Sequence, residues 1–246
     1  AEKGINVHAY DGFKPVVWFW QALLKDPQRL ADLTESYRRG GRHIYKDEKV
    51  FAKGLRKKDF IRFREEVRFA IEKRHPFSFE LAAKVYAINR SSFSGTTLTG
   101  GFSERASYAR FTDSQISYIR NFKINNLTVK HADFRESIKK HACHLYLDPP
   151  YFLEGIRSKL YGDEGDMHEF FPHLDLFAVL RKRDNWILSY NDCEEIRSLY
   201  RDYEIHEAAW TYGMNKSKES SEIIITNLPK RTHCVIMENT REKIND

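Results

Sequence analysis

The residues that could do chemistry are concentrated in one short segment, Leu145–Phe152, with the sequence LYLDPPYF. A short apolar run predicts a strand that ends at Asp148. The two prolines that follow lack backbone N–H groups and cannot continue a helix, so the carbonyls of Asp148 and Pro149 remain acceptors. Beside the ring of Tyr151, they suit an exocyclic amino group on a planar base. The alternative is an ordinary strand exit with a buried tyrosine, and the flanking apolar and aromatic residues favour the binding site.

The elements around this segment predict an α/β fold. Short apolar runs alternate with amphipathic stretches in the second half of the chain, which indicates a mostly parallel sheet. The carboxyl ends of such strands are where ligands collect. We expect strands at residues 127–131, 144–147, 186–190, 204–210 and 221–227, and helices at residues 134–140, 171–183 and 194–203.

The first half of the chain has a different pattern. Residues 5–10 predict a strand, and one long amphipathic helix is expected over residues 15–37. Further helices are expected at residues 59–72 and 77–88, where apolar residues recur at helical spacing. Residues 89–109 are rich in Ser, Gly and Thr and predict a loop or short hairpin.

Charge is distributed unevenly along the 246 residues. The whole chain has 41 Lys and Arg against 35 Asp and Glu, a net charge of +6. Residues 38–75 alone contain 14 Lys and Arg and 6 Asp and Glu, so this block carries +8 and the rest of the chain −2. The block indicates a nucleic-acid-binding surface. A solvated amphipathic helix is the plainer interpretation, and both can hold together.

Composition excludes several other classes of protein. Cys143, Cys193 and Cys234 are an odd and scattered set, so we expect no disulfide framework. No apolar run approaches the roughly 20 residues of a membrane span. No secretory leader opens the chain, so a cytoplasmic location is expected. His141, Cys143 and His144 lack a second ligand pair at suitable spacing, and we predict no metal site.

Several segments together resemble the Dam-type (D12 class) S-adenosylmethionine-dependent DNA adenine-N6 methyltransferases. Asp148-Pro149-Pro150-Tyr151 resembles the catalytic motif of that family, and the resemblance extends from about Val7 to Asn227. The other segments that carry it are residues 7–11, 87–90, 93–95, 101–103, 132–134, 187–191 and 220–227.

The resemblance implies a Rossmann-like methyltransferase sheet with a helical, basic target-recognition insertion. Residues 1–35 and 126–246 would form the catalytic core, and residues 36–125 the insertion that binds double-stranded DNA. The implied reaction transfers a methyl group from S-adenosylmethionine to the N6 amino group of adenine, after the base is flipped out of the duplex. A restriction endonuclease partner is compatible with the resemblance, and we expect a monomer.

The resemblance also implies roles for particular residues. Asp148 and the Pro149 carbonyl would accept hydrogen bonds from the adenine N6 group, and Tyr151 would stack on the flipped ring. The implied residues are Asp148, Pro149, Pro150 and Tyr151 for catalysis; Asp11, Asp133, Phe134 and Asp148 for the cofactor; Tyr151 and Phe152 for the base; and Asn89, Arg90, Arg105 and Lys216 for DNA.

One family feature is missing from the sequence. The family's Phe-x-Gly-x-Gly strand and turn, whose glycines let the backbone approach the cofactor, occurs neither before Val7 nor elsewhere. Three explanations are open: a chain cut at its front, a front segment supplied separately, or a decayed gene. We favour the first, because Ala1 is not an initiator methionine.

Two alternative functions stay open at this point. The first is a catalytically inactive DNA-binding fragment or subunit that keeps the basic surface. The second is methyl transfer to RNA or to a protein amide, which uses a similar acceptor loop. Members of that second kind tend to have Asn before Pro-Pro, so Asp148 and the basic block favour DNA.

Overall fold

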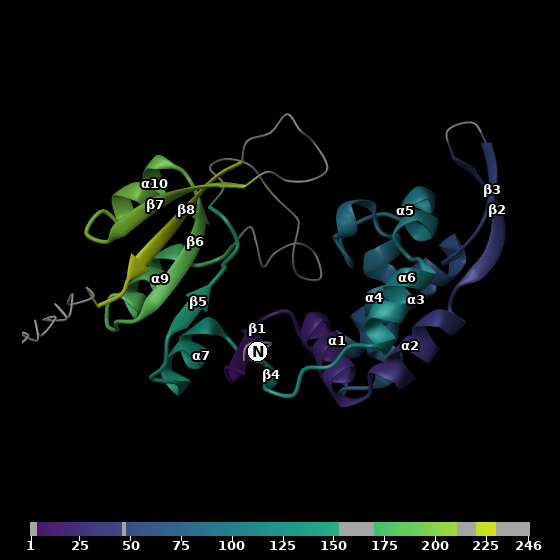
Figure 1. Cartoon of the computed structure of the whole chain (residues 1–246), viewed down its shortest axis with the longest axis horizontal. Coiled ribbons are helices and arrows are strands. Elements are labelled where there is room, and N and C mark those ends of the chain that lie inside the picture. Colours follow the sequence, from purple (N-terminus) through teal and green to yellow (C-terminus); the bar gives the residue numbers. More distant parts are fainter. Residues whose placement is uncertain (1–3, 46–47, 153–169, 211–219, 230–246) are drawn as a thin grey trace, which may run out of the picture. The chain divides into compact units, whose positions relative to one another are not determined.

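The chain folds into two compact units (Figure 1). The computed structural model describes residues 4–45, 48–152, 170–210 and 220–229. Residues 1–142 and 150–179 form the first unit, and residues 143–149 and 180–246 form the second. Each unit is described by itself below.

Helices dominate the first unit. The buried α4 (Phe79–Ser91) packs against α1 (Lys14–Lys25), α2 (Pro27–Ser36) and α3 (Lys57–Glu72). Their apolar faces meet in one core with side chains such as Trp18, Leu30, Phe60 and Ile88, all at most 2% exposed. The helices predicted over residues 59–72 and 77–88 are confirmed, because their helical spacing puts one apolar face against this core.

The single helix predicted over residues 15–37 is wrong. Asp26 ends α1 and begins α2, and its carboxylate accepts a hydrogen bond from the backbone N–H of Arg29 at 2.9 Å. Pro27 occupies the first turn of α2, where its missing N–H costs nothing. A capping aspartate followed by proline is a helix start signal, and here it divides the amphipathic stretch in two.

The segment predicted as loop or hairpin over residues 89–109 contains more helix than expected. It holds an isolated antiparallel bridge between Ser92 and Phe102, and α5 (Glu104–Ala109) follows. The Ser103 hydroxyl accepts the Ala106 N–H at 3.2 Å and so caps α5. A hairpin of β2 (Arg39–Tyr45) and β3 (Glu48–Gly54) was not predicted, because its strands lack apolar alternation.

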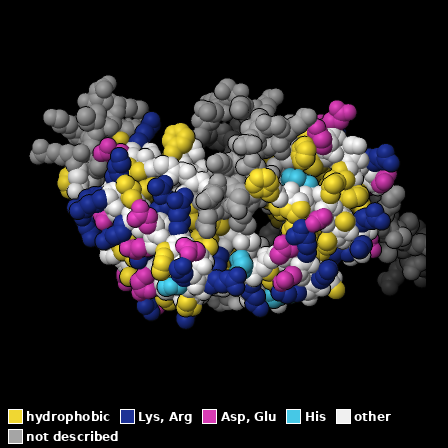
Figure 2. Space-filling model, turned by 180° about the vertical axis from the view of Figure 1, so that it is seen from behind, with side chains coloured by type: hydrophobic (Ala, Val, Ile, Leu, Met, Phe, Trp, Pro, Cys, Tyr) yellow, Lys and Arg dark blue, Asp and Glu magenta, His cyan; other side chains and the backbone are white. Residues whose placement is uncertain are grey.

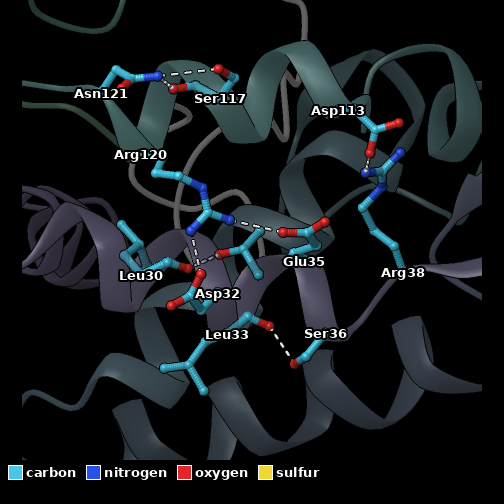
Figure 3. Close-up of polar contacts among 11 residues, drawn as sticks. Leu30, Asp32, Leu33, Glu35, Ser36, Arg38, Asp113, Ser117, Arg120 and Asn121 are labelled. Carbon is cyan, nitrogen blue, oxygen red and sulfur yellow. Dashed lines mark hydrogen bonds and ion pairs between the residues drawn. The ribbon is translucent and has the colours of Figure 1, made fainter.

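Two arginines connect α6 (Asp113–Arg120) to the region of α2. Arg120, at the end of α6, pairs with Asp32 and with Glu35 of α2, the latter at 2.8 Å (Figure 3). Arg38, just after α2, pairs with Asp113 at the start of α6. The Arg38 side chain is buried, so this second pair lies at the edge of the core.

The first unit also contains two parallel strands and the helices that follow them. β1 (Val7–Asp11) pairs with β4 (Leu127–His131), in a register that puts Asp11 beside His131 at the carboxyl ends. The predicted strand at 127–131 is confirmed, and the strand predicted at 5–10 begins and ends slightly later. α7 (Phe134–Lys140) follows β4 as predicted, and α9 (His173–Leu180) is shorter than the predicted helix 171–183.

The second unit is built on a four-stranded sheet in the order β5-β6-β8-β7. The strands are β5 (Leu145–Leu147), β6 (Trp186–Asn191), β7 (Glu204–Trp210) and β8 (Ser220–Asn227), with α10 (Glu194–Leu199) between β6 and β7. Large aromatic side chains fill its core, with Trp186, Tyr190 and Tyr200 fully buried.

The predicted α/β class is confirmed, but the predicted mostly parallel sheet is not what the described strands show. Two of their pairings, β1 with β4 and β5 with β6, are parallel, and the other three are antiparallel. The reason is that β8 runs antiparallel to both neighbours and that β2 and β3 form a hairpin. Strand positions along a sequence do not reveal these directions. Among the described helices, none is long and apolar enough to cross a membrane.

Candidate active site

The acidic end of β5 is held by the neighbouring strand. Leu147 pairs with Leu188 in parallel register, so the next residue of β6, Ser189, lies beside Asp148. The Ser189 hydroxyl donates to Asp148 Oδ1 at 2.9 Å. Asp148 is exposed, whereas Ser189 is only 3% exposed. An exposed carboxylate is therefore tied to a buried hydroxyl within the second unit.

The two residues after Asp148 bring no backbone donor to this edge. Pro149 and Pro150 are half-buried, and neither has an N–H. The Asp148 carboxylate is therefore exposed at this edge of the sheet with no backbone donor from the next two residues. The acceptor role predicted for the carbonyls of Asp148 and Pro149 stays a prediction.

The aromatic residues of the motif lie in the first unit. Tyr151 and Phe152 are both half-buried. The ring of Phe152 packs edge-on against His173 of α9, with the ring centroids 5.3 Å apart. Phe152 thus has a packing partner of its own, and its contact with the target base stays a prediction.

Asp11 lies at the carboxyl end of β1, where the cofactor acid was predicted. Its Oδ1 accepts the Phe13 N–H at 2.6 Å, and its backbone carbonyl accepts the Ala132 N–H at 3.3 Å. Burial raises the pKa of the Asp11 carboxyl, while the Phe13 N–H and the nearby His131 oppose that change. A partly desolvated carboxylate in this position would gain from further hydroxyl donors.

Asp133 and Phe134, the predicted contacts to the cofactor's adenine, begin α7. Asp133 caps the helix by accepting the Arg135 N–H at 2.8 Å, and its other oxygen pairs with the Arg135 guanidinium at 3.0 Å. The Phe134 ring packs against Phe171, at 5.4 Å between centroids. Asp11 and Asp133 therefore follow the carboxyl ends of two adjacent parallel strands, the usual ligand edge of an α/β sheet.

A small cavity of about 270 Å³ lies against β1 and β4. Asp11 is its acidic residue, and most of the other side chains that line it are apolar: Ala9, Tyr10, Val16, Trp20, Leu127 and Val129. Asp11 therefore stands between an apolar surface and the polar strand ends. Asp11 and Asp133 belong to the first unit and Asp148 to the second, so the cavity beside Asp11 and the edge of the sheet at Asp148 are described separately.

Two of the predicted DNA contacts are engaged within the first unit. The Asn89 amide donates to the Gly95 carbonyl at 2.7 Å and to the Thr97 hydroxyl at 3.0 Å. Arg90 donates to the Arg110 carbonyl at 3.1 Å and to Gln115 at 2.9 Å. Arg105 is exposed on α5. Lys216 lies outside the described residues, and the DNA contacts of all four stay predictions.

Further arginines hold the carbonyls of the loop over residues 92–100. Arg68 of α3 donates to the Leu98 carbonyl at 3.0 Å, and Arg64 to the Gly100 carbonyl at 3.3 Å. Arg110 donates to the Ser92 carbonyl. Part of the charge in the basic block is thus half-buried and engaged with the carbonyls of this loop.

The same loop presents an aromatic ring that the sequence analysis did not single out by itself. Phe93 is 70% exposed, although phenylalanine side chains are usually buried. The residues around it have a left-handed backbone, with φ of +53° at Ser94 and +76° at Gly95. The signal available in the sequence was a phenylalanine among Ser and Gly residues, a setting that forms turns and not cores.

The start of α3 presents lysines to solvent. Lys57 and Lys58 are exposed, and within the described part of the chain neither has an ion-pair partner. They occupy the first turn, where the helix dipole disfavours positive charge. Figure 2 shows Lys and Arg side chains at the surface of the molecule, interspersed with Asp and Glu.

Comparison with known proteins places these residues in a family context. The family model for the D12 class N6 adenine-specific DNA methyltransferases matches residues 2–214. The match covers the first unit from residue 2 onward and residues 143–149 and 180–214 of the second unit, and it includes every predicted site residue except Lys216. No curated protein matches the chain significantly.

Proposed function

Because the chain belongs to the D12 class of N6 adenine-specific DNA methyltransferases, we propose that Asp148-Pro149-Pro150-Tyr151 is where its target adenine is methylated. The protein is a DNA methyltransferase that acts on adenine and uses S-adenosylmethionine as methyl donor. The finer proposal is that a base flipped from double-stranded DNA enters this acceptor edge.

The observation that carries the proposal is the exposed carboxylate of Asp148, fixed by Ser189 at 2.9 Å beside two residues that cannot donate. An adenine N6 amino group offers two N–H donors, and the Asp148 carboxylate and the Pro149 carbonyl offer acceptors for them. These hydrogen bonds increase the electron density at N6 and orient its lone pair for attack. Tyr151 stacks on the ring and holds it in place.

The residues at the ends of β1 and β4 fit the methyl donor. Asp11 is a partly buried carboxylate that can accept ribose hydroxyls, and Asp133 lies at the adjacent strand end. When bound, S-adenosylmethionine supplies an electrophilic methyl group. Asp11 and Asp133 would anchor it by its sugar and base, and Phe134 would add an apolar face.

We assign DNA binding to residues 36–125, the helical and basic part of the first unit. Lys57, Lys58 and Arg105 are exposed cations in this region, suited to phosphate contacts. Phe93 is an exposed ring on a turn that arginines hold in shape, suited to contact with bases. We further propose that residues 1–35 and 126–246 form a Rossmann-like catalytic core. The protein is proposed to act as a monomer in the cytoplasm, with or without a restriction endonuclease partner.

Replacement of the catalytic carboxylate tests the proposal. Asp148→Ala should lower methylation of adenine in duplex DNA by about a hundredfold or more, because a group in contact with the reacting amine is lost. Incorporation of labelled methyl groups into unmethylated plasmid DNA measures the rate. The melting temperature should stay close to that of wild type, so that the loss is one of methyl transfer and not of folding.

Asp202→Ala is the matched control, since Asp202 is a carboxylate of the second unit that is 86% exposed. It should methylate DNA at the wild-type rate. Robust turnover by Asp148→Ala would contradict the assignment of the site. Wild-type protein that binds duplex DNA but shows no saturable binding of S-adenosylmethionine would instead support the alternative of an inactive DNA-binding fragment.

A further inference from the structure

The carboxylate of Asp148 lacks the local support that other aspartates in this chain have. Asp11 and Asp133 each accept the backbone N–H two residues on, from Phe13 and from Arg135. Such local bonds are the usual way in which an aspartate at a turn is oriented. After Asp148 the next two residues are prolines, which have no backbone N–H, so the Asp148 carboxylate cannot accept this local hydrogen bond.

Ser189 supplies the missing donor from another strand. Its hydroxyl lies 2.9 Å from Asp148 Oδ1 and 3.4 Å from the Leu147 carbonyl, so the carboxylate is the nearer acceptor. Ser189 is 3% exposed and lies within β6, which is paired on both sides by β5 and β8. The donor is therefore fixed by the sheet, while the acceptor faces solvent.

Tyr146 completes a short chain of hydroxyls. Its oxygen lies 3.3 Å from the Ser189 hydroxyl oxygen. A serine hydroxyl has one proton, and when that proton points to Asp148 the oxygen can accept from Tyr146. Tyr146 and Asp148 are two residues apart near the end of β5, so their side chains share one face of the sheet. The phenol thereby favours the direction in which Ser189 donates.

We propose that Ser189 is a positioning residue for methyl transfer. It holds Asp148 Oδ1 and leaves Oδ2 to accept the amino group of the target adenine, and Tyr146 reinforces the arrangement. Ser189 does not touch the substrate in this scheme; it acts through Asp148. The inference rests on the proposed role of Asp148 and adds to it two residues, on β5 and β6, that set the carboxylate's orientation.

The test separates chemistry from stability. Under single-turnover conditions, with S-adenosylmethionine saturating and enzyme in excess over unmethylated plasmid DNA, Ser189→Ala should lower the methylation rate constant about tenfold, the loss expected for one charge-assisted hydrogen bond. The dissociation constant for S-adenosylmethionine should not change. Ser189→Thr keeps the hydroxyl and should restore the rate to within about twofold of wild type. Tyr146→Phe, at a side chain 67% exposed, should lower the rate about threefold, a smaller loss because its bond is indirect.

Thr34→Val is the matched control. It removes a fully buried hydroxyl that donates to the Leu30 carbonyl, and it should lower the melting temperature without changing the rate constant. Should Ser189→Ala fail to fold, Ser189→Cys, whose thiol is a weak donor, takes its place in the comparison with Ser189→Thr.

A wild-type rate in Ser189→Ala, or a rate in Ser189→Thr as low as in Ser189→Ala, would overturn the inference. If Asp148→Ala is inactive at the same time, the proposed function stands and only the positioning role is lost. If Asp148→Ala is active, the proposed site itself fails.

Discussion

At the scale of single residues, Tyr151 is the part of the site whose proposed role depends on a ring face. It follows two prolines, which restrict the backbone just before it and so limit the positions its ring can take. Its neighbour Phe152 packs edge-on against His173, which anchors the chain immediately after it. A ring on a backbone restricted in this way would lose less conformational freedom on stacking against a base.

Replacement of Tyr151 should therefore separate stacking from hydrogen bonding. Tyr151→Ala should lower kcat/KM for DNA by about tenfold to a hundredfold, because base–aromatic stacking is worth about 1–3 kcal/mol. Tyr151→Phe keeps the ring face and should stay within about threefold of wild type. The fluorescence of 2-aminopurine at the target position, which rises when the base leaves the stack, should show the same order of variants. Equal losses in the two variants would mean that the hydroxyl matters more than the ring.

Sequence reasoning at this scale could find groups but not their neighbours. Asp148 and its prolines are contiguous, so their shared chemistry can be predicted from the sequence. The hydrogen bond from Ser189 joins residues 41 positions apart, and it depends on the register of β5 against β6. Asn89 and Arg90 show the converse, since both are predicted to contact DNA but their side chains have partners within the first unit, Gly95 for Asn89 and Gln115 for Arg90.

At the scale of elements, the ion pair between Arg38 and Asp113 fixes the start of α6. The Arg38 side chain is 3% exposed, while that of Asp113 is 76% exposed. The hydrogen bond and charge of Arg38 hold the pKa of Asp113 below its usual range. The pair matters mainly because it satisfies a buried guanidinium, which is costly to leave unpaired.

Asp113→Asn should consequently lower the free energy of unfolding by about 1–2 kcal/mol at pH 7, at the lower end of the range for bonds to charged groups because water reaches Asp113. A folded-state pKa below the unfolded value of 3.8 means that the stabilisation is fully present above pH 3.8. It is lost as pH falls through the lowered folded-state pKa. Urea unfolding of both proteins from pH 7 down to pH 2.5 measures the difference.

The comparison with Asp32→Asn controls for loss of a surface carboxylate. Asp32 pairs with Arg120, whose side chain is 35% exposed and which keeps Glu35 as a second partner. This variant should cost about 0.5 kcal/mol or less. An equal cost in the two variants, or a cost of Asp113→Asn that persists at the lowest pH, would contradict the argument from burial.

Elements were predictable where one periodic signal decides them. The helix at 59–72 and the strands at 127–131 and 204–210 have clear patterns, and the structure places them there within a few residues. The β2–β3 hairpin has a charged, glycine-containing sequence, and its pairing depends on a partner strand. The direction of β8 against β6 is likewise a tertiary property, so the share of antiparallel pairing could not be predicted.

At the scale of the whole molecule, the net charge of +8 over residues 38–75 overstates the positive surface available to DNA. Arg38, Arg64 and Arg68 donate to groups inside the first unit. Arg62 pairs with Asp59 at 3.1 Å. Lys57 and Lys58 are different, because they are exposed in the first turn of α3, where the helix dipole repels positive charge. Cations kept at an unfavourable position are candidates for a role in binding.

The double variant Lys57→Gln/Lys58→Gln should weaken DNA binding and stabilise the fold together. If each lysine neutralises one phosphate, the slope of log K against log salt concentration should become shallower by about 1.8, since each contact contributes about 0.9. Removal of two charges from the first turn of α3 should raise stability by about 0.3–1 kcal/mol.

Lys139→Gln/Lys140→Gln is the matched control, because it makes the same change in net charge at the last turn of α7, where cations are favourable. It should leave the slope unchanged and slightly lower the stability. Fluorescence anisotropy with a labelled duplex between 50 and about 300 mM salt measures the slope. Similar slopes in the two double variants would mean that DNA responds only to total charge, and the basic block would lose its assignment as the recognition surface.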